Sequence, residues 1–277
     1  MIAGYRDGVD KPVPRSAVLG ALVHQIEMQD AVNQIIAAAH EERPLGVSAL
    51  AVHGVMESVD DSELRYRIND LELVVPDGQP VRWALNWLYG AGLAERVYGP
   101  DLMANVCERA AAEGLPVYLF GSSEATLEKL RTRLALRYPG LKLAGSHASR
   151  FRQATVAEQR EDLERIRAST ARIVFVGLGC PRQEVWTYEN RLEISLPVTA
   201  VGAAFDYLAG TTKQPAAWMQ RRGLEWLHRL VKEPRRLWRR YLVLNPRYLM
   251  LLTLFRLGLL RVEPESGMRP VEPLRPG

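Results

Sequence analysis

Asp77 stands directly after the apolar, strand-like run LELVV, in the sequence Pro76-Asp77-Gly78. A carboxylate at the carboxyl end of a parallel strand faces the crevice in which such sheets bind ligands, and there it can act as a general base toward an attacking hydroxyl group. Aspartate and glycine are also the residues that tight turns prefer for backbone reasons. A catalytic carboxylate and a plain Asp-Gly turn are therefore the two interpretations of this position.

A second polar segment, residues 177–184, follows the apolar run IVFV and opens a helical stretch. Gly177 and Gly179 let backbone N–H groups approach a phosphate, and the start of a helix favours negative charge. Arg182 and Gln183 are placed to donate to the same oxygens. The segment matches neither GxxxxGK[ST] nor GxGxxG, so it predicts a phosphate site of another kind, with a tight turn as the alternative.

Further polar residues occur where they can reach the same crevice. Asp206 lies in VGAAFDY, where small residues permit close approach of a ligand, and its carboxylate can accept from a base or ribose; the alternative is that it caps a short helix. Arg96 precedes a helix expected to start after an N-cap at Asp101 and can clamp a diphosphate, whereas a solvated surface arginine is the alternative. His53 can reach the crevice, but a lone histidine is more often structural. Because HExxH, DxD and paired-histidine spacings are absent, no metal site and no cofactor are predicted.

The basic charge of the chain is concentrated near its C-terminal end. Residues 218–247 hold eight Arg and one Lys against Glu225 and Glu233, a local excess of +7 in a chain whose net charge is +4, so the remainder carries −3. Tryptophan beside a basic face is typical of segments that lie on an anionic membrane surface or grip phosphates. Arg221, Arg222 and Arg229 are close enough in sequence to fold over the crevice, and a solvated basic face is the alternative.

The elements that must position these residues alternate between strands and helices. Strand-like runs occur at 17–23, 47–52, 71–75, 117–121, 141–145, 173–177 and 198–201, and amphipathic stretches of helical length occur at 30–42, 60–69, 81–88, 101–113, 124–138, 157–169 and 182–192. This alternation predicts an α/β fold with a mostly parallel sheet and helices on both faces, Rossmann-like in outline. The nearly continuous apolar runs agree, because parallel strands are buried on both sides.

Composition and pattern divide the 277 residues into four parts. We expect a flexible leader over 1–15, an α/β catalytic domain over 16–215, a helical basic appendage over 216–260 and a proline-rich disordered tail over 261–277. A hydrophobic content of 47% with 25% charged residues is typical of a globular protein. The start of the chain lacks the pattern of a signal peptide, and no apolar run is long enough to span a bilayer, so a cytoplasmic location is predicted. Two cysteines give no disulfide framework.

With these residues in view, the chain resembles the WecG/TagA/CpsF glycosyltransferases, which add a sugar to a saccharide carried on polyprenyl diphosphate. The matching segments are LVVPDGQPVRWA, ERVYGPDLM, VYLFGSS, VFVGLGCPRQE, VGAAFDYLAG and PAAWMQRRGLEWLHRLVKEPRRLWRRYLVLNP. They follow one another in order over residues 71–246. The resemblance implies an inverting, metal-independent transfer from a UDP-sugar, at the inner face of the cell membrane, in surface or exopolysaccharide synthesis.

The resemblance also implies roles for individual residues. Asp77 matches the base that deprotonates the acceptor hydroxyl, Arg96 and Gln183 match positions that hold the donor, and Asp206 matches a position near the uracil. Arg221 and its neighbours match an appendage that closes over the site with cationic side chains. Where a branch of the family carries Thr and Asn, this chain has Ser48 to His53, which leaves N-acetylmannosamine, its uronic acid and glucose open as the transferred sugar.

Two other functions compete with this interpretation. A nucleotide-dependent oxidoreductase would share the fold but lacks the GxGxxG fingerprint. A nucleic-acid-binding module would use the arginine and tryptophan residues for phosphates and stacking, yet it leaves both glycine-bearing strand ends without a purpose. We therefore expect UDP-sugar, lipid-linked saccharide and membrane as partners and no nucleic acid, with an oligomer left open.

Overall fold

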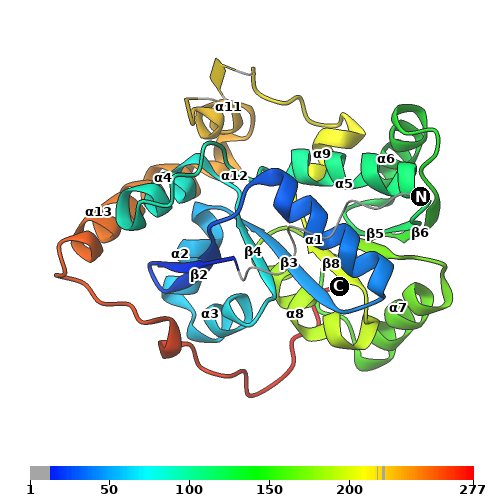
Figure 1. The fold of residues 1–277 in the computed structure, drawn as a ribbon, viewed down its shortest axis with the longest axis horizontal. Helices are drawn as coiled ribbons and strands as arrows, with labels where there is room; N and C mark the ends of the chain where they lie inside the picture. Colours follow the sequence, from blue (N-terminus) through cyan, green and yellow to red (C-terminus); the bar gives the residue numbers. More distant parts are fainter. Residues whose placement is uncertain (1–12, 217, 220–221) are drawn as a thin grey trace, which may run out of the picture.

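A computed structural model describes residues 13–216, 218–219 and 222–277 (Figure 1). Most of the predicted leader and Arg221 lie outside the described residues. The centre of the fold is a six-stranded sheet in the order β4-β3-β8-β7-β5-β6, and every neighbouring pair is parallel. Its strands are β3 (Leu45–Leu50), β4 (Leu73–Pro76), β5 (Val117–Gly121), β6 (Leu143–His147), β7 (Ile173–Gly177) and β8 (Pro197–Ala200). The predicted α/β fold is confirmed.

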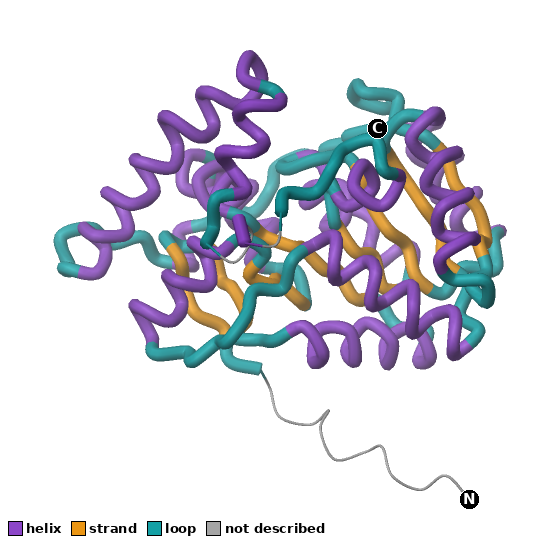
Figure 2. Tube along the Cα trace, turned by 90° about the horizontal axis from the view of Figure 1, so that it is seen from above, coloured by secondary structure: helices purple, strands orange, loops and turns teal. Residues whose placement is uncertain are grey.

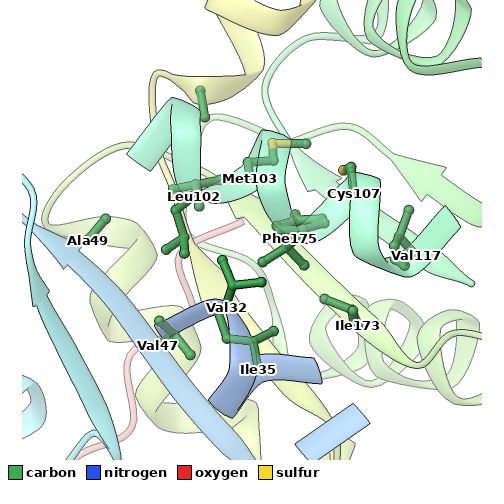
Figure 3. Packing of buried hydrophobic residues seen from close by; sticks show 14 of the residues in the cluster. Val32, Ile35, Val47, Ala49, Leu102, Met103, Cys107, Val117, Ile173 and Phe175 are labelled. Atoms are coloured by element: carbon green, nitrogen blue, oxygen red, sulfur yellow. The ribbon is translucent and has the colours of Figure 1, made fainter. Parts of the chain in front are cut away.

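Helices cover both faces of this sheet, as the layered tube of Figure 2 shows. One face carries α1 (Met28–Glu41), α5 (Gly99–Glu113), α6 (Glu124–Arg137) and α9 (Ala204–Ala209). The other carries α2 (Val52–Asp60), α3 (Ser62–Asn69), α4 (Gln79–Tyr89), α7 (Val156–Ala168) and α8 (Arg182–Ile194). Phe175 of β7 packs in the cluster that includes residues of α1 and α5 (Figure 3). The neighbouring Val174 belongs to the cluster with residues of α7 and α8, so successive side chains of β7 point to opposite faces.

The chain before α1 departs from the prediction of one strand over 17–23. It forms a two-stranded antiparallel hairpin of β1 (Arg15–Val18) and β2 (Ala21–His24). Leu19 and Gly20 turn the chain with φ of 51° and 88°. A two-residue turn with positive φ at both positions matches the twist of the flanking strands, which is why the apolar run folds back on itself.

The basic appendage is helical, as the sequence indicated. It contains α11 (Glu225–Lys232), α12 (Pro234–Arg239), the π-helix η1 (Arg240–Leu244) and α13 (Asn245–Arg256). Tyr248 of α13 is buried and donates to the carbonyl of Pro80 in α4 at 3.1 Å, so α13 lies against α4 (Figure 1). Arg247 makes a second link through both its Nη atoms to the Asp60 carboxylate, at 2.6 Å each.

The segment predicted as a disordered tail lies along the body of the protein. Arg65 and Arg67, both buried, donate to the carbonyls of Ser266 at 3.0 Å and Glu272 at 3.2 Å. Farther on, the N–H of Ala154 donates to the carbonyl of Arg275 at 2.7 Å. Backbone carbonyls of a proline-rich chain thus satisfy buried guanidinium groups, an arrangement that composition alone does not indicate.

Helix α6 provides a test of the core. Leu130 is fully buried against the sheet, whereas Leu136 on the same helix is 77% exposed. Leu130→Ala should lower the free energy of unfolding by about 2–5 kcal/mol, because it leaves a cavity in the packed interior. The matched control Leu136→Ala should change it by less than about 0.5 kcal/mol. Urea denaturation of both variants checks this, and equal effects would contradict the packing of α6.

Candidate active site

A cavity of about 540 Å³ lies at the carboxyl ends of β3, β4, β7 and β8. The chain runs from β3 outward to β4 and then crosses to the other side of the sheet for β5. Crevices at such reversals are where open α/β sheets bind ligands. Helix α11 contributes Glu225, Trp226 and Arg229 to the lining, so the appendage closes the side of the cavity that the sheet leaves open.

Most of the predicted site residues line this one cavity. The group comprises Asp77, Arg96, Gly177, Gly179, Gln183, Asp206 and Arg229. They come from five separate parts of the chain and span more than 150 positions. The parallel sheet gathers the residues that follow its strands at one edge, and α11 of the appendage adds Arg229.

Asp77 lies in the loop between β4 and α4, and the residue after it, Gly78, is the N-cap of α4. Its Oδ1 accepts a hydrogen bond of 2.9 Å from the N–H of Gly99, the first residue of α5. Burial raises the pKa of Asp77 to about 6, against the lowering effects of Arg96, the Gly99 N–H and Arg229; Glu225 raises it further. A carboxyl group with this pKa is ionised at neutral pH and is a stronger base than an ordinary aspartate.

Arg96 is mostly buried beside Asp77. Its Nη2 forms an ion pair with Oε1 of Glu225, and its guanidinium carbon lies 4.1 Å from the centre of the Tyr98 ring. The surface-arginine alternative for Arg96 is therefore wrong, since only 9% of its side chain is exposed. Asp101 is also not the N-cap of the following helix: α5 begins at Gly99 with Tyr98 as its N-cap, and Asp101 lies in its first turn.

The glycine segment, residues 177–180, forms part of the wall of the same cavity as Asp77. A side chain at Gly177 would come within 2.7 Å of the Phe205 ring, so this glycine allows α9 to approach β7. Gly179 has φ of +78° and open space where a side chain would be, so it leaves room in the cavity. Its N–H donates to Oε1 of Gln183 at 3.2 Å. Arg182 does not line the cavity; it donates to the Ser149 hydroxyl and to the carbonyl of Gly277.

Beneath this wall lies a buried carboxyl group that the sequence did not single out. Oε1 of Glu184 accepts from the Ser48 hydroxyl at 3.2 Å and from the Gln183 amide at 3.0 Å. Burial raises the pKa of Glu184. The carboxyl group thereby orients the Gln183 side chain, whose oxygen in turn holds Gly179. Glu184 follows Gln183 directly, but only the fold shows that it points to Ser48 of β3.

Asp206 lies in the first turn of α9, whose N-cap is Ala203, so the helix-capping alternative is wrong. Its Oδ1 accepts from the Thr211 hydroxyl at 3.2 Å. The carboxylate is half-buried at the edge of the cavity. It remains able to accept hydrogen bonds from a ligand through its second oxygen.

The three arginines predicted to close the site differ in position. Arg229 lines the cavity together with Tyr98, Tyr207 and Tyr241. Arg222 is exposed, stands 6.0 Å from the ring centre of Trp218 and does not line the cavity. Arg221 lies outside the described residues. Of the closure set, Arg229 alone is seen in the part of the cavity wall that the structure describes.

Sequence reasoning missed Glu225 and the tyrosines of the cavity. Glu225 and Arg229 are four residues apart on α11 and therefore share one face of that helix. That spacing could have drawn attention to Glu225, which was counted only as a charge. Tyr98 and Tyr207, which are mostly buried with ring centres 6.4 Å apart, carry no signal of their own in the sequence.

His53 lines the cavity from the first turn of α2, not from a strand end, and its Nδ1 lies 3.4 Å from Oε1 of Glu57. Within the described ranges, no three His, Cys, Asp or Glu side chains gather in a way that could hold a metal ion. The metal independence of the reaction stays a prediction.

A comparison with protein families decides the broad identity of the chain. The family model described as "Glycosyl transferase WecG/TagA/CpsF family" matches residues 16–261, most of the sequence. The chain belongs to the WecG/TagA/CpsF family. It is therefore a glycosyltransferase of cell-surface polysaccharide synthesis.

Membership in the WecG/TagA/CpsF family extends through the appendage, because the match ends at residue 261. The family match thus covers both the α/β body and helices α11 to α13. In the portion of this glycosyltransferase that the structure covers, every helix is too short or too polar to cross a bilayer.

The burial of Asp77 predicts a cost in stability. Its pKa is about 6 in the folded protein against an ordinary 3.8, so the folded state binds the proton more tightly. The cost is absent below pH 3.8, grows as the pH rises and is complete above pH 6. Asp77→Asn should therefore raise the free energy of unfolding by about 1–3 kcal/mol at pH 7.5.

Chemical denaturation at pH 7.5 and at pH 4.5 measures this gain, which should shrink at the lower pH. The exposed Asp30→Asn serves as the control and should change the free energy of unfolding by less than about 0.5 kcal/mol at either pH. If Asp77→Asn lowers the free energy of unfolding at pH 7.5, the charged carboxylate stabilises the folded protein. That result would contradict the raised pKa of Asp77.

Proposed function

We propose that this glycosyltransferase transfers a hexosyl or N-acetylhexosaminyl group from a UDP-sugar to a saccharide carried on polyprenyl diphosphate. The observation that carries the proposal is the presence of one basic carboxylate, Asp77, and two guanidinium groups, Arg96 and Arg229, in a single cavity walled by the glycine segment. A base for the acceptor and cations for the leaving group are the two requirements of such a transfer.

The transfer is a single displacement with inversion. Asp77 takes the proton of the acceptor hydroxyl. At the same time the oxygen of that hydroxyl forms a bond to the anomeric carbon of the donor, on the face opposite UDP. The bond between that carbon and the diphosphate oxygen breaks, and UDP leaves with the electron pair. A base with a pKa near 6 works well at neutral pH, because it is ionised yet still accepts a proton in the transition state.

The leaving diphosphate gains negative charge, which must be balanced. Arg96 is 9% exposed between Tyr98 and Glu225, and Arg229 is half-buried in the lining of the same cavity, so both guanidinium groups are partly removed from water. Fixed cations in such surroundings stabilise a developing anion more strongly than they would in water. These arginines supply the charge that a divalent metal provides in other transferases, and no metal is required. The oxygen of Gln183 and the carboxylate of Asp206 provide acceptors for the nucleoside and sugar hydroxyls.

A direct trial of this reaction incubates the enzyme with UDP-sugars and a prenyl-diphosphate saccharide in the presence of EDTA. Transfer with at least one donor and acceptor pair, with inversion at the anomeric carbon, is expected. If transfer is lost in EDTA and is restored when Mg²⁺ is added, the proposed metal independence is wrong. Absence of transfer with every pair would remove the proposed reaction.

Asp77→Asn should lower kcat by at least about 10²-fold, since positioned general bases contribute about 10²–10⁴-fold. The Kd for UDP should not rise, because Asn keeps the shape of the side chain and removes a negative charge that repels the diphosphate. In the unsubstituted enzyme kcat/KM should fall as the pH drops below about 6, where Asp77 takes up a proton. Initial rates between pH 5 and 8 and calorimetric UDP titration measure these effects. A variant that retains full turnover would place the base elsewhere.

We further propose that the enzyme docks on the inner face of the cell membrane through α4 and the appendage. Trp83 and Trp87 of α4 are 44% and 52% exposed, and Trp238, Leu249 and Met250 of the adjoining helices are also more than half exposed. Exposed aromatic and aliphatic side chains next to a cluster of arginines suit an anionic bilayer surface, into which the apolar groups insert.

The double variant Trp83→Ala/Trp87→Ala should lower partitioning onto vesicles of phosphatidylglycerol by about tenfold or more, since an inserted aromatic side chain contributes about 1.5–3 kcal/mol. The control Leu136→Ala/Leu192→Ala removes two exposed leucines from α6 and α8 and should leave partitioning unchanged. Flotation at low and high salt provides the measurement. Equal loss of binding in both double variants would contradict a role for α4.

A further inference from the structure

A negatively charged side chain such as Glu225 is not expected in a cavity proposed to bind a diphosphate. It is the first residue of α11, and its carboxylate projects between the appendage and the body. A carboxylate repels a phosphate, and the repulsion is strong where water is scarce. The side chain of Glu225 is only 15% exposed. Neither the proton transfer nor the stabilisation of the leaving diphosphate in the proposed reaction uses this residue.

The partner of Glu225 explains its position. Its Oε1 pairs with Nη2 of Arg96, one of the two cations assigned to the leaving group. The Tyr98 ring gives Arg96 a second contact besides Glu225, since the guanidinium carbon lies 4.1 Å from the ring centre. Two carboxylates, Asp77 and Glu225, thus flank one guanidinium, with Arg229 as the second cation that faces Asp77. The arrangement is balanced in charge without any ligand.

We propose that Glu225 is a positioning residue that holds the place of the donor diphosphate on Arg96 and is displaced when the diphosphate binds. This inference rests on the proposed function, because it takes a diphosphate as the ligand. When UDP-sugar enters, its phosphate oxygens take over Arg96, and the side chain of the released Glu225 rotates away from Arg96 while α11 keeps Arg229 in the cavity wall. When UDP leaves, Glu225 returns to Arg96 and competes with rebinding of the product.

The exchange gives the site two properties. An empty cavity keeps its cations neutralised, so α11 stays docked on the body without a ligand. The ion pair also lowers the affinity for UDP, because the ligand must break it, and this favours product release. Binding of donor is thereby coupled to the conformation of the Glu225 side chain on the appendage helix that carries Arg229.

Glu225→Gln tests the proposal, since the amide keeps the size of the side chain and removes its charge. The Kd for UDP and for inorganic pyrophosphate should fall by about tenfold. The coupling between close charge pairs at binding sites is large enough to change a Kd by this factor or more. The acid limb of the kcat/KM profile should move to lower pH, because the charge of Glu225 raises the pKa of Asp77. The KM for donor should fall together with kcat, as UDP leaves more slowly.

Asp60→Asn is the matched control. Asp60 pairs with Arg247 at 2.6 Å, so this variant also removes a carboxylate that joins the body to the appendage, but outside the cavity. It should leave the Kd for both ligands and the pH profile unchanged. In an Arg96→Ala background, Glu225→Gln should no longer tighten UDP binding, because the cation for which the two compete is gone.

Unchanged or weaker binding of both ligands by Glu225→Gln would overturn the proposal. Tightened binding of pyrophosphate with no binding of UDP by any variant would support the exchange on Arg96 and contradict the UDP-sugar donor. Tightening by Asp60→Asn to the same extent would show that loosening of the appendage, not release of Arg96, is responsible, and would also overturn the proposal.

Discussion

The desolvation of Asp77 is the constraint on which the rest of the site depends. A carboxylate held at the end of β4 and closed off by α11 is costly to ionise, and only one backbone N–H and nearby guanidinium groups offset that cost. The same burial that opposes ionisation makes the group a better base. Arg96 and Arg229 act against that cost and favour the ionised form. In the proposed reaction they also stabilise the departing anion, so that base strength and leaving-group stabilisation are two effects of one cluster of charges.

The cluster is assembled from parts of the chain that could not meet without the parallel sheet and the appendage together. The sheet brings Asp77, Gly179 and Asp206 to one edge, because the strands before them are parallel and their carboxyl ends coincide. The appendage adds Glu225 and Arg229, which both lie on α11. The appendage is joined to α4 and α2 through another of its helices, α13.

The fold and much of the site could be predicted from residue patterns. The continuous apolar runs of β5 and β7 and their spacing from helical stretches indicated a parallel sheet, and polar residues after strands indicated where a ligand would bind. The hairpin of β1 and β2 was not predicted, because a positive φ at Leu19 has no signature in an apolar run. The binding of the 261–277 segment to buried Arg65 and Arg67 was missed as well, since it uses backbone carbonyls. Glu225 escaped notice because its role depends on Arg96, 129 residues away along the chain.

Hydrogen–deuterium exchange of the full chain with and without UDP tests the central claim most directly, that the strand ends and α11 form one diphosphate site. Binding of UDP should slow exchange together in the loop of Asp77, in residues 177–184 and around Asp206, and should change exchange at the start of α11. Protection confined to other elements, or protection of residues 177–184 with no change in α11, would contradict the account.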